Sequence, residues 1–398
     1  MKKVICVILS VCLIFIEYGY VQTGNHLEKA KGSRGVDVQT HQGSQDPEKI
    51  NKDKPLDKPK ENGKEDFKPM AIGGKFKDTE EITTAKKKFP WLIVCGILVV
   101  GGIVAVLLLS KKKGSPSQPI SQYEFVTAWG SGGSGDGQLS GPTGIAVDSS
   151  GNVYVSDGNN RIQKFTSSGS FITKWGSQGS GDGQFMGPHG IAIDSAGNVY
   201  VADINNHRIQ KFSSDGNFIT KWGSGVDPFP YGIAVDSSGN VYITGMSAHR
   251  IQKFTSEGNF ITEWGSGGSE DGQFKQPYGI AIDRVGNVYV ADTVNNRIQK
   301  FTAGGSFMTK WGSWGSGDGQ FNLPYGIAID SAGNVYVTDT VNNRIQKFTA
   351  GGSFITKWGS PGSGDGQFKA PQGIAVDSSG NVYVTDNGNH RVQKFRPK

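Results

Sequence analysis

Cysteine is almost absent from this chain of 398 residues, and this excludes disulfides and thiol chemistry from most of it. Only three cysteines occur, and all of them lie in apolar N-terminal segments: Cys6, Cys12 and Cys95. Residues 123–398 therefore contain neither a thiol nor a disulfide, and they give no indication of the redox compartment.

Residues 123–398 also lack an excess of either charge, with 21 Lys and Arg against 22 Asp and Glu. The formal net charge of +6 comes from the first 122 residues, which hold the remaining 20 basic (41 − 21) and 13 acidic (35 − 22) side chains. Binding to phosphate requires clustered Lys and Arg. Nucleic acid is therefore not expected as a partner, and only a local basic face would allow it to bind.

Helical periodicity is missing from the same region, which repeats one pattern six times instead. The tryptophans that close the copies are 46, 47, 42, 47 and 47 residues apart: Trp129, Trp175, Trp222, Trp264, Trp311 and Trp358. A glycine opens the phrase Gly-Ile-Ala-(Val/Ile)-Asp in each copy: Gly144, Gly190, Gly232, Gly279, Gly326 and Gly373. Such a period indicates an array of supersecondary units, none of which can bury its apolar surface alone.

One copy, residues 279–312, has the composition of four short strands joined by Gly, Asn, Asp and Ser turns. The strand-like runs are 279–283, 288–291, 297–301 and 307–311. Residues 123–129 match only the fourth strand, whereas the last copy ends after its third strand at residues 391–395. The two ends therefore complete one blade together. We predict an all-β, six-bladed β-propeller over residues 123–398, closed by this strand exchange and without a free edge between its blades.

The repeated phrase resembles the NHL repeat. The resemblance is carried by Pro188–Asp194, Gly197–Asp203 and Asn206–Phe212, and it recurs in register through all six copies. It implies a propeller used mainly as a binding platform. The family includes RNA- and protein-binding domains of tripartite-motif ubiquitin ligases, sensor domains of bacterial receptor kinases and an amidating lyase, so the fold alone does not select a function.

The first 122 residues differ from the repeats in composition. Residues 1–23 resemble a signal or anchor segment, with Lys2 and Lys3 before an apolar run. Residues 24–88 are charged and poor in large apolar side chains, which predicts a disordered tether. Residues 89–110 begin with 21 uncharged residues between lysine clusters, which predicts a transmembrane helix, and residues 111–122 form a short linker.

These segments place the protein in the membrane of the cell envelope but leave the side of the propeller open. If residues 1–23 act as a signal, the second apolar segment returns the propeller to the cytoplasm. If they do not, residues 89–110 become a signal-anchor and the propeller is exported. The lysines on the N-terminal side of that segment and the Gly-, Asn-, Ser- and Thr-rich composition of the propeller favour export.

Three recurring groups in the propeller suggest ligands but are better explained by structure. An Asp ends the second strand and an Arg follows four or five residues later: Asp157 and Arg161, Asp203 and Arg208, Asp292 and Arg297, Asp339 and Arg344, Asp386 and Arg391. Asp-Gly-Gln loops supply one carboxylate each, or two where Glu270 precedes Asp271, too few for calcium: Asp136, Asp182, Asp271, Asp318 and Asp365. His207, His249 and His390 lie on different blades, so they and His189 are not expected to converge on zinc. No metal or other cofactor is expected.

The copies differ most at the residue x of the phrase Pro-x-Gly. These residues are Thr143, His189, Tyr231, Tyr278, Tyr325 and Gln372. We expect them to surround the mouth of the central channel, on the same face as the Asp-Asn-Asn loops, and to bind the ligand. Their variation is equally explained by weak constraint at a rim. Blade three also departs, with Gly245 in place of Asp and a shorter loop before Pro230, which indicates either an apolar notch for a partner or drift.

The sequence thus favours a membrane-tethered, non-catalytic binding, sensing or scaffold module for a protein, peptide or glycan. A metal-dependent lyase or lactonase of the propeller type is the alternative, and an RNA-binding propeller is the third reading.

Overall fold

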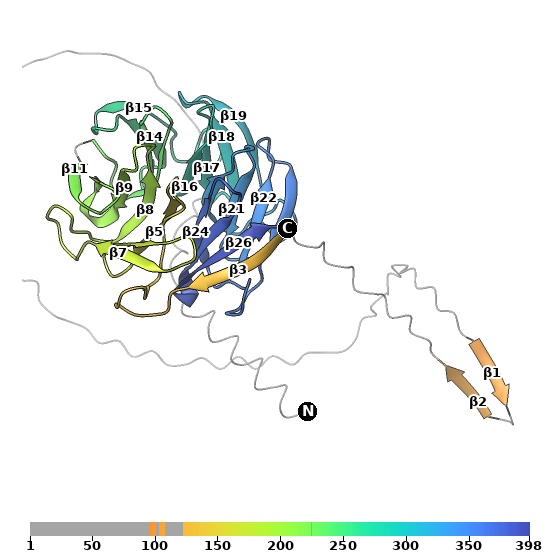
Figure 1. Cartoon of the computed structure of the whole chain (residues 1–398). Coiled ribbons are helices and arrows are strands. Elements are labelled where there is room, and N and C mark those ends of the chain that lie inside the picture. Colours follow the sequence, from red (N-terminus) through yellow and green to blue (C-terminus); the bar gives the residue numbers. More distant parts are fainter. Residues whose placement is uncertain (1–95, 101–102, 108–121, 224) are drawn as a thin grey trace, which may run out of the picture. The chain divides into compact units, whose positions relative to one another are not determined.

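The predicted propeller is present. The computed structural model describes residues 96–100, 103–107, 122–223 and 225–398, and its propeller consists of six four-stranded antiparallel sheets (Figure 1). In the first five blades the chain runs from the innermost strand to the outermost strand and then enters the next blade.

The first three blades follow one another along the chain. Blade one contains β4 (Ile145–Val147), β5 (Val153–Asp157), β6 (Arg161–Phe165) and β7 (Phe171–Trp175). Blade two contains β8 (Pro188–Ile193), β9 (Val199–Asp203), β10 (Arg208–Phe212) and β11 (Phe218–Trp222), with the 3-10 helix η1 (Ile204–Asn206) between β9 and β10. Blade three contains β12 (Pro230–Val235), β13 (Val241–Gly245), β14 (Arg250–Phe254) and β15 (Phe260–Trp264).

The last three blades have the same order. Blade four contains β16 (Pro277–Ile282), β17 (Val288–Asp292), β18 (Arg297–Phe301) and β19 (Phe307–Trp311). Blade five contains β20 (Pro324–Ile329), β21 (Val335–Asp339), β22 (Arg344–Phe348) and β23 (Phe354–Trp358). Blade six contains β24 (Pro371–Val376), β25 (Val382–Asp386), η2 (Asn387–Asn389), β26 (Arg391–Pro397) and β3 (Tyr123–Trp129).

The core lies between neighbouring blades rather than within any one of them. The second strand of every blade is buried along its whole length, because its two faces contact the blades on either side. This explains the uninterrupted Val-Tyr-Val or Val-Tyr-Ile runs in these strands, which would otherwise alternate with polar residues. A tyrosine from one blade packs with valines and a phenylalanine of the next, as Tyr154 does with Val199 and Phe212.

The ring closes as predicted, because β3 from the start of the propeller pairs with β26 at its end (Figure 1). Tyr123, the first residue of β3, is 5% exposed and stacks on Trp358 with the ring centroids 4.5 Å apart. Its hydroxyl lies 2.7 Å from that of Tyr336 in blade five. In the other blades a turn glycine, such as Gly352 over Trp311, covers the equivalent tryptophan. In blade six β3 comes from the other end of the propeller, so no turn joins it to β26. Tyr123 covers Trp358 in place of that turn.

The apolar segment 89–110 does not have the predicted helix in its described residues. They form β1 (Gly96–Val100) and β2 (Ile103–Leu107), which pair antiparallel with Val100 opposite Ile103. β-branched residues favour strands, and the two residues between the strands are both glycine, a pair typical of short hairpins. No helix in the described residues is long and apolar enough to span a membrane. The predicted signal segment 1–23, tether 24–88 and nearly all of the linker 111–122 lie outside the described residues.

Replacing Tyr123 by alanine is expected to lower the free energy of unfolding by about 3–5 kcal/mol, because a buried aromatic ring is lost from the closing strand. Tyr123→Phe keeps the stacking on Trp358 but loses the hydroxyl group, which contacts Tyr336 and Lys347, so a loss of about 1–2 kcal/mol is expected. Urea unfolding of the full chain measures both values. A loss below 1 kcal/mol for Tyr123→Ala would show that closure does not depend on this contact.

Candidate functional site

The candidate site begins at six glycines where the inner strands approach the propeller axis. These glycines are Gly144, Gly190, Gly232, Gly279, Gly326 and Gly373. A Cβ atom added to any of them would lie 2.0–2.4 Å from the backbone oxygen of the x residue in the next blade. Real Cβ contacts are essentially never shorter than 3.0 Å. Only glycine therefore fits at this position, and the x residue before it is brought to the axis.

The x residues surround the axial channel at the end where the Asp-Asn-Asn loops also lie, since Pro188 pairs with Asp203. A cavity of about 70 Å³ occupies this end of the channel, and five of the six predicted residues line it: Thr143, His189, Tyr231, Tyr278 and Tyr325. The six glycines contribute to its wall, together with the isoleucines that follow them, each 6% exposed: Ile145, Ile191, Ile233, Ile280, Ile327 and Ile374. Gln372 does not line the cavity, and its Oε1 is buried without a hydrogen-bond partner.

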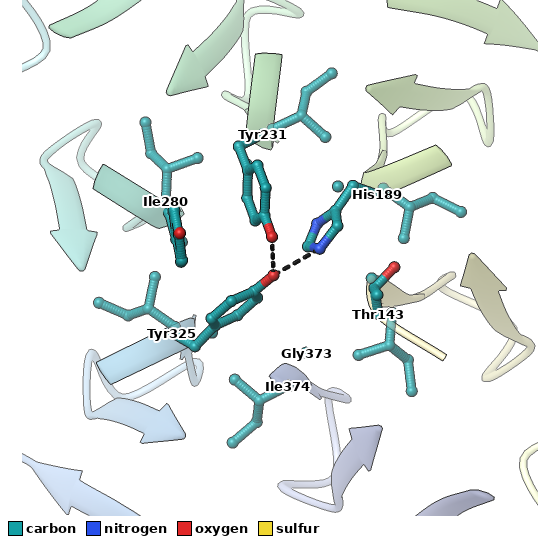
Figure 2. Close-up of a pocket in the computed structure, with 17 residues that line it drawn as sticks. Thr143, His189, Tyr231, Ile280, Tyr325, Gly373 and Ile374 are labelled. Carbon is teal, nitrogen blue, oxygen red and sulfur yellow. Dashed lines mark hydrogen bonds between the residues drawn. The ribbon is translucent and has the colours of Figure 1, made fainter. Parts of the chain in front are cut away.

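Four of these lining side chains are aromatic rings that contact one another: His189, Tyr231, Tyr278 and Tyr325. The Tyr325 hydroxyl lies 2.6 Å from His189 Nε2 and also bonds to the Tyr231 hydroxyl, so a hydrogen-bonded chain crosses the axis (Figure 2). Tyr231 stacks on Tyr278 with the ring centroids 4.4 Å apart and an interplanar angle of 17°. His189 and Tyr325 come from blades on opposite sides of the ring, which the sequence pattern did not reveal.

This aromatic group is uncharged at neutral pH, and burial moves its pKa values further from neutrality. Burial lowers the pKa of His189 to about 3 and raises the pKa of Tyr231 to about 12, although the hydrogen bond to Tyr325 partly opposes the second shift. Burial also raises the pKa of Tyr278, and it raises that of Tyr325 well above its ordinary value. At pH 7 the imidazole is therefore neutral and all three phenols keep their protons. Such groups can donate and accept hydrogen bonds but cannot neutralise a charged ligand.

The repeated Asp and Arg residues are structural, as the sequence indicated. In five blades the Arg Nε lies 2.7–2.8 Å from the carboxylate of its own blade: Asp157, Asp203, Asp292, Asp339 and Asp386. The rest of the guanidinium donates to carbonyls of the loop entering that blade; Arg208, for example, bonds to the oxygens of Ser180, Gly181 and Gln184. The pair thus ties this loop to the sheet.

The Asp-Gly-Gln loops are tight turns. The glutamine side chain accepts a hydrogen bond from a backbone N–H within its own turn, as Gln184 does from Gly181 at 3.0 Å. The aspartate forms a half-exposed ion pair with a lysine of the outer strand in four blades: Asp136 with Lys174, Asp182 with Lys221, Asp271 with Lys310 and Asp318 with Lys357. Within the described residues, no group of three or more His, Cys, Asp or Glu is placed to hold a metal ion.

Blade three compensates internally for its sequence changes. The carboxylate of Asp227, in the shortened loop, bonds to Arg250 Nε at 2.7 Å, and a Cβ at Gly245 would lie 2.6 Å from its Oδ2. Glu263, at 2.9 Å from Arg250 Nη1, replaces the loop carbonyls that the other blades supply. Phe260 on the outer strand of this blade is 53% exposed. The sequence left an apolar notch and plain drift as alternatives for the shortened loop; in the structure its Asp227 is paired with Arg250.

Five segments of the chain match the NHL repeat: residues 139–165, 185–212, 274–301, 321–348 and 368–395. Residues 222–251, which include most of blade three up to the start of its third strand, match a different beta-propeller repeat. Among curated proteins, none has a sequence that matches this chain.

Several solved structures share the propeller fold at low sequence identity. A streptogramin B lyase superposes with a TM-score of 0.51 at 18% identity, over 69% of this chain and 98% of the lyase. A gluconolactonase from Xanthomonas campestris gives 0.51 at 14%, over 66% and 88%. A protein of unknown function from Bacteroides thetaiotaomicron gives 0.55 at 16%, over 69% and 76%. At these identities the similarity establishes the fold alone.

Acidification is expected to destabilise the propeller through His189. The folded imidazole resists protonation down to about pH 3, whereas the unfolded one accepts a proton near pH 6.5. The free energy of unfolding should therefore keep its full value above pH 6.5. At lower pH it should decrease, with a slope approaching about 1.4 kcal/mol per pH unit. Urea unfolding of the parent and of His189→Gln between pH 7.5 and 5 measures the difference. Equal losses in both proteins would contradict the burial of a neutral imidazole.

Proposed function

Because this chain belongs to the NHL-repeat β-propellers, we propose that its propeller is a non-catalytic binding module held at the membrane by the N-terminal segments. Its ligand is a protein, a peptide or a glycan that docks on the face carrying the axial cavity and inserts one uncharged group between the aromatic side chains. The observation that carries this proposal is the small, neutral cavity at the centre of that face.

The size of the cavity favours docking over enclosure of a substrate. Sites that enclose a small molecule usually measure roughly 300–1,000 Å³, whereas this cavity measures about 70 Å³. It would hold on the order of five water molecules. A side chain or the edge of a sugar ring fits this space, and the rest of the ligand would lie outside it.

The electrostatics of the cavity also favour binding over acid–base catalysis. A general acid or base works best when its pKa lies near the working pH, and His189 is held far below neutrality while the tyrosines are held above it. The lining residues carry no formal charge at pH 7, so a charged group inserted here would lose hydration without gaining a partner. An uncharged group with an apolar face and a hydroxyl or amide would meet both aromatic rings and hydrogen-bonding atoms.

Because a lyase and a lactonase are among the structural neighbours, an enzymatic function is the competing proposal. It is tested by incubating the protein with streptogramin B and with gluconolactone, with Mg²⁺, Ca²⁺ or Zn²⁺ added. RNA binding competes less well, because the propeller has no net positive charge and four of its outer-strand lysines are paired with aspartates.

Screening the full-length chain against defined arrays of synthetic peptides and neutral oligosaccharides tests the proposal. We expect at least one of these classes to bind. Tyr278→Ala should weaken the interaction about tenfold or more, measured by titration calorimetry, because a half-buried aromatic contact is lost. Val285→Ala is the matched control, since Val285 is 82% exposed and lies in the turn at the opposite end of blade four.

Three outcomes would contradict the proposal. Turnover of streptogramin B or the lactone would favour the enzyme, and binding of single-stranded RNA that weakens steeply with salt would favour the third reading. Array hits that weaken with Val285→Ala but not with Tyr278→Ala would place the binding surface elsewhere.

A further inference from the structure

Each blade has one residue in the left-handed backbone conformation directly before the repeated arginine. These residues are Asn160, His207, His249, Asn296, Asn343 and His390, with φ between 51° and 59°. Asparagine and histidine are enriched in this region of backbone space among residues other than glycine. The position therefore carries three asparagines and three histidines in one otherwise uniform array.

All six side chains make the same contact with the next blade. Each accepts a hydrogen bond, 2.8–3.2 Å long, from the backbone N–H of the residue two positions before a ring residue. We call these contacts the blade latches. The asparagine latches bind the N–H of Gly187, Leu323 and Ala370, and the histidine latches bind that of Phe229, Gln276 and Gly141.

The latches anchor the segments that carry the axial ring. In every blade the bonded residue is followed by a proline and then by the ring residue x. The latches of His390, His207 and His249 thus hold the segments that lead to Thr143, Tyr231 and Tyr278. The asparagine latches hold the segments that lead to His189, Tyr325 and Gln372. Half of the ring is held by imidazole and half by amide groups.

The two kinds of latch differ in how they respond to protons. The amide oxygen of asparagine is an acceptor at any physiological pH. The imidazole Nδ1 accepts only while the ring is neutral, because both nitrogens become donors in the protonated ring. Histidine is the side chain that commonly changes charge between pH 5 and 8, and all three of these imidazoles are at least partly exposed.

The loop facing each latch fits its side chain. A Cβ at Gly267 would lie 3.2 Å from His249 Cδ2, and a Cβ at Gly132 would lie 3.5 Å from His390 Cδ2. Where the latch is asparagine, the equivalent loop positions carry the larger residues Gln178, Trp314 and Pro361. His207 faces the shortened loop, where its ring meets that of Phe229 edge-on at 4.9 Å.

We propose that mild acid releases the three histidine latches and loosens the segments of Thr143, Tyr231 and Tyr278, while the asparagine-held half of the ring stays in place. This is a pH-dependent regulation of the proposed binding site, and its relevance to ligands rests on that function. The protonated Nδ1 places a second donor against the backbone N–H, so the contact is lost and becomes repulsive.

The charged groups around the histidine latches have other partners in most cases. The turns of His207, His249 and His390 carry Arg208, Arg250 and Arg391, bonded to Asp203, Asp227 and Asp386. The loop facing His207 carries Asp227, which is paired with Arg250. The loop facing His390 carries Asp136, which is paired with Lys174. The loop facing His249 carries Glu270, Lys275 and Asp271, and Asp271 is paired with Lys310. In the described part of the chain, no ion pair involves these three imidazoles.

Amide hydrogen exchange of the full-length chain at pH 7.5 and 5.5, corrected for the intrinsic exchange rate, tests the proposal. Protection at Phe229, Gln276 and Gly141 should fall several-fold, up to about tenfold, at pH 5.5. Protection at Gly187, Leu323 and Ala370 should stay within twofold. These three amides are an internal control, because general loosening in acid would affect all six.

A triple variant, His207→Asn, His249→Asn and His390→Asn, supplies the matched control, since asparagine makes the same contact in the other blades. It should fold, as shown by an unchanged β spectrum, and its six amides should respond to acid alike. An equal response of all six amides in the parent would overturn the proposal. A larger loss of protection at Phe229, Gln276 and Gly141 that persists in the triple variant would overturn it as well. The measurement needs no ligand, so its result is independent of whether the propeller proves to be a binding module.

Discussion

The contact between neighbouring inner strands at the axis is the constraint on which the rest of the propeller depends. Six glycines bring the backbone of each blade so close to the next that no Cβ fits between them. This closeness moves the residue before each glycine to the axis and leaves a cavity of about 70 Å³. The small size of the site is therefore a consequence of how the blades pack, and the chemistry of the site is set by the six residues at position x.

The constraint also explains which positions vary. Residues between blades are uniform because each contacts two neighbours, as the buried Val-Tyr-Val strands do, and a change in one would require a change in both. Blade three shows what such a change requires: the loss of an aspartate at Gly245 is matched by Asp227, and the loss of loop carbonyls is matched by Glu263. Position x follows a proline at the axis and lines the cavity in five of the six blades, so the demands of packing between blades do not fix which side chain it carries.

Much of the fold could be predicted from the sequence because the repeat is strict. The period gave the number of blades, the two incomplete copies gave the closure through β3 and β26, and the phrase Pro-x-Gly located the axial residues. Contacts between distant blades could not be predicted this way. The hydrogen bonds of Tyr325 to His189 and Tyr231 cross the axis, and Gln372 does not line the cavity although its backbone position is equivalent. For residues 89–110 the membrane-spanning segment stays a prediction, and the residues described there, 96–100 and 103–107, form β1 and β2.

The most direct measurement of the central constraint compares two glycines in blade five. A Cβ at Gly326 would lie 2.2 Å from the backbone oxygen of Gln372, whereas the nearest atom to a Cβ at Gly351 is 4.0 Å away. Urea unfolding of Gly326→Ala should show a free energy of unfolding lower by about 1–3 kcal/mol or more, with Gly351→Ala within about 0.5 kcal/mol of the parent. Equal stabilities of the two variants would contradict the account, because the inner strands would then not be in backbone contact at the axis.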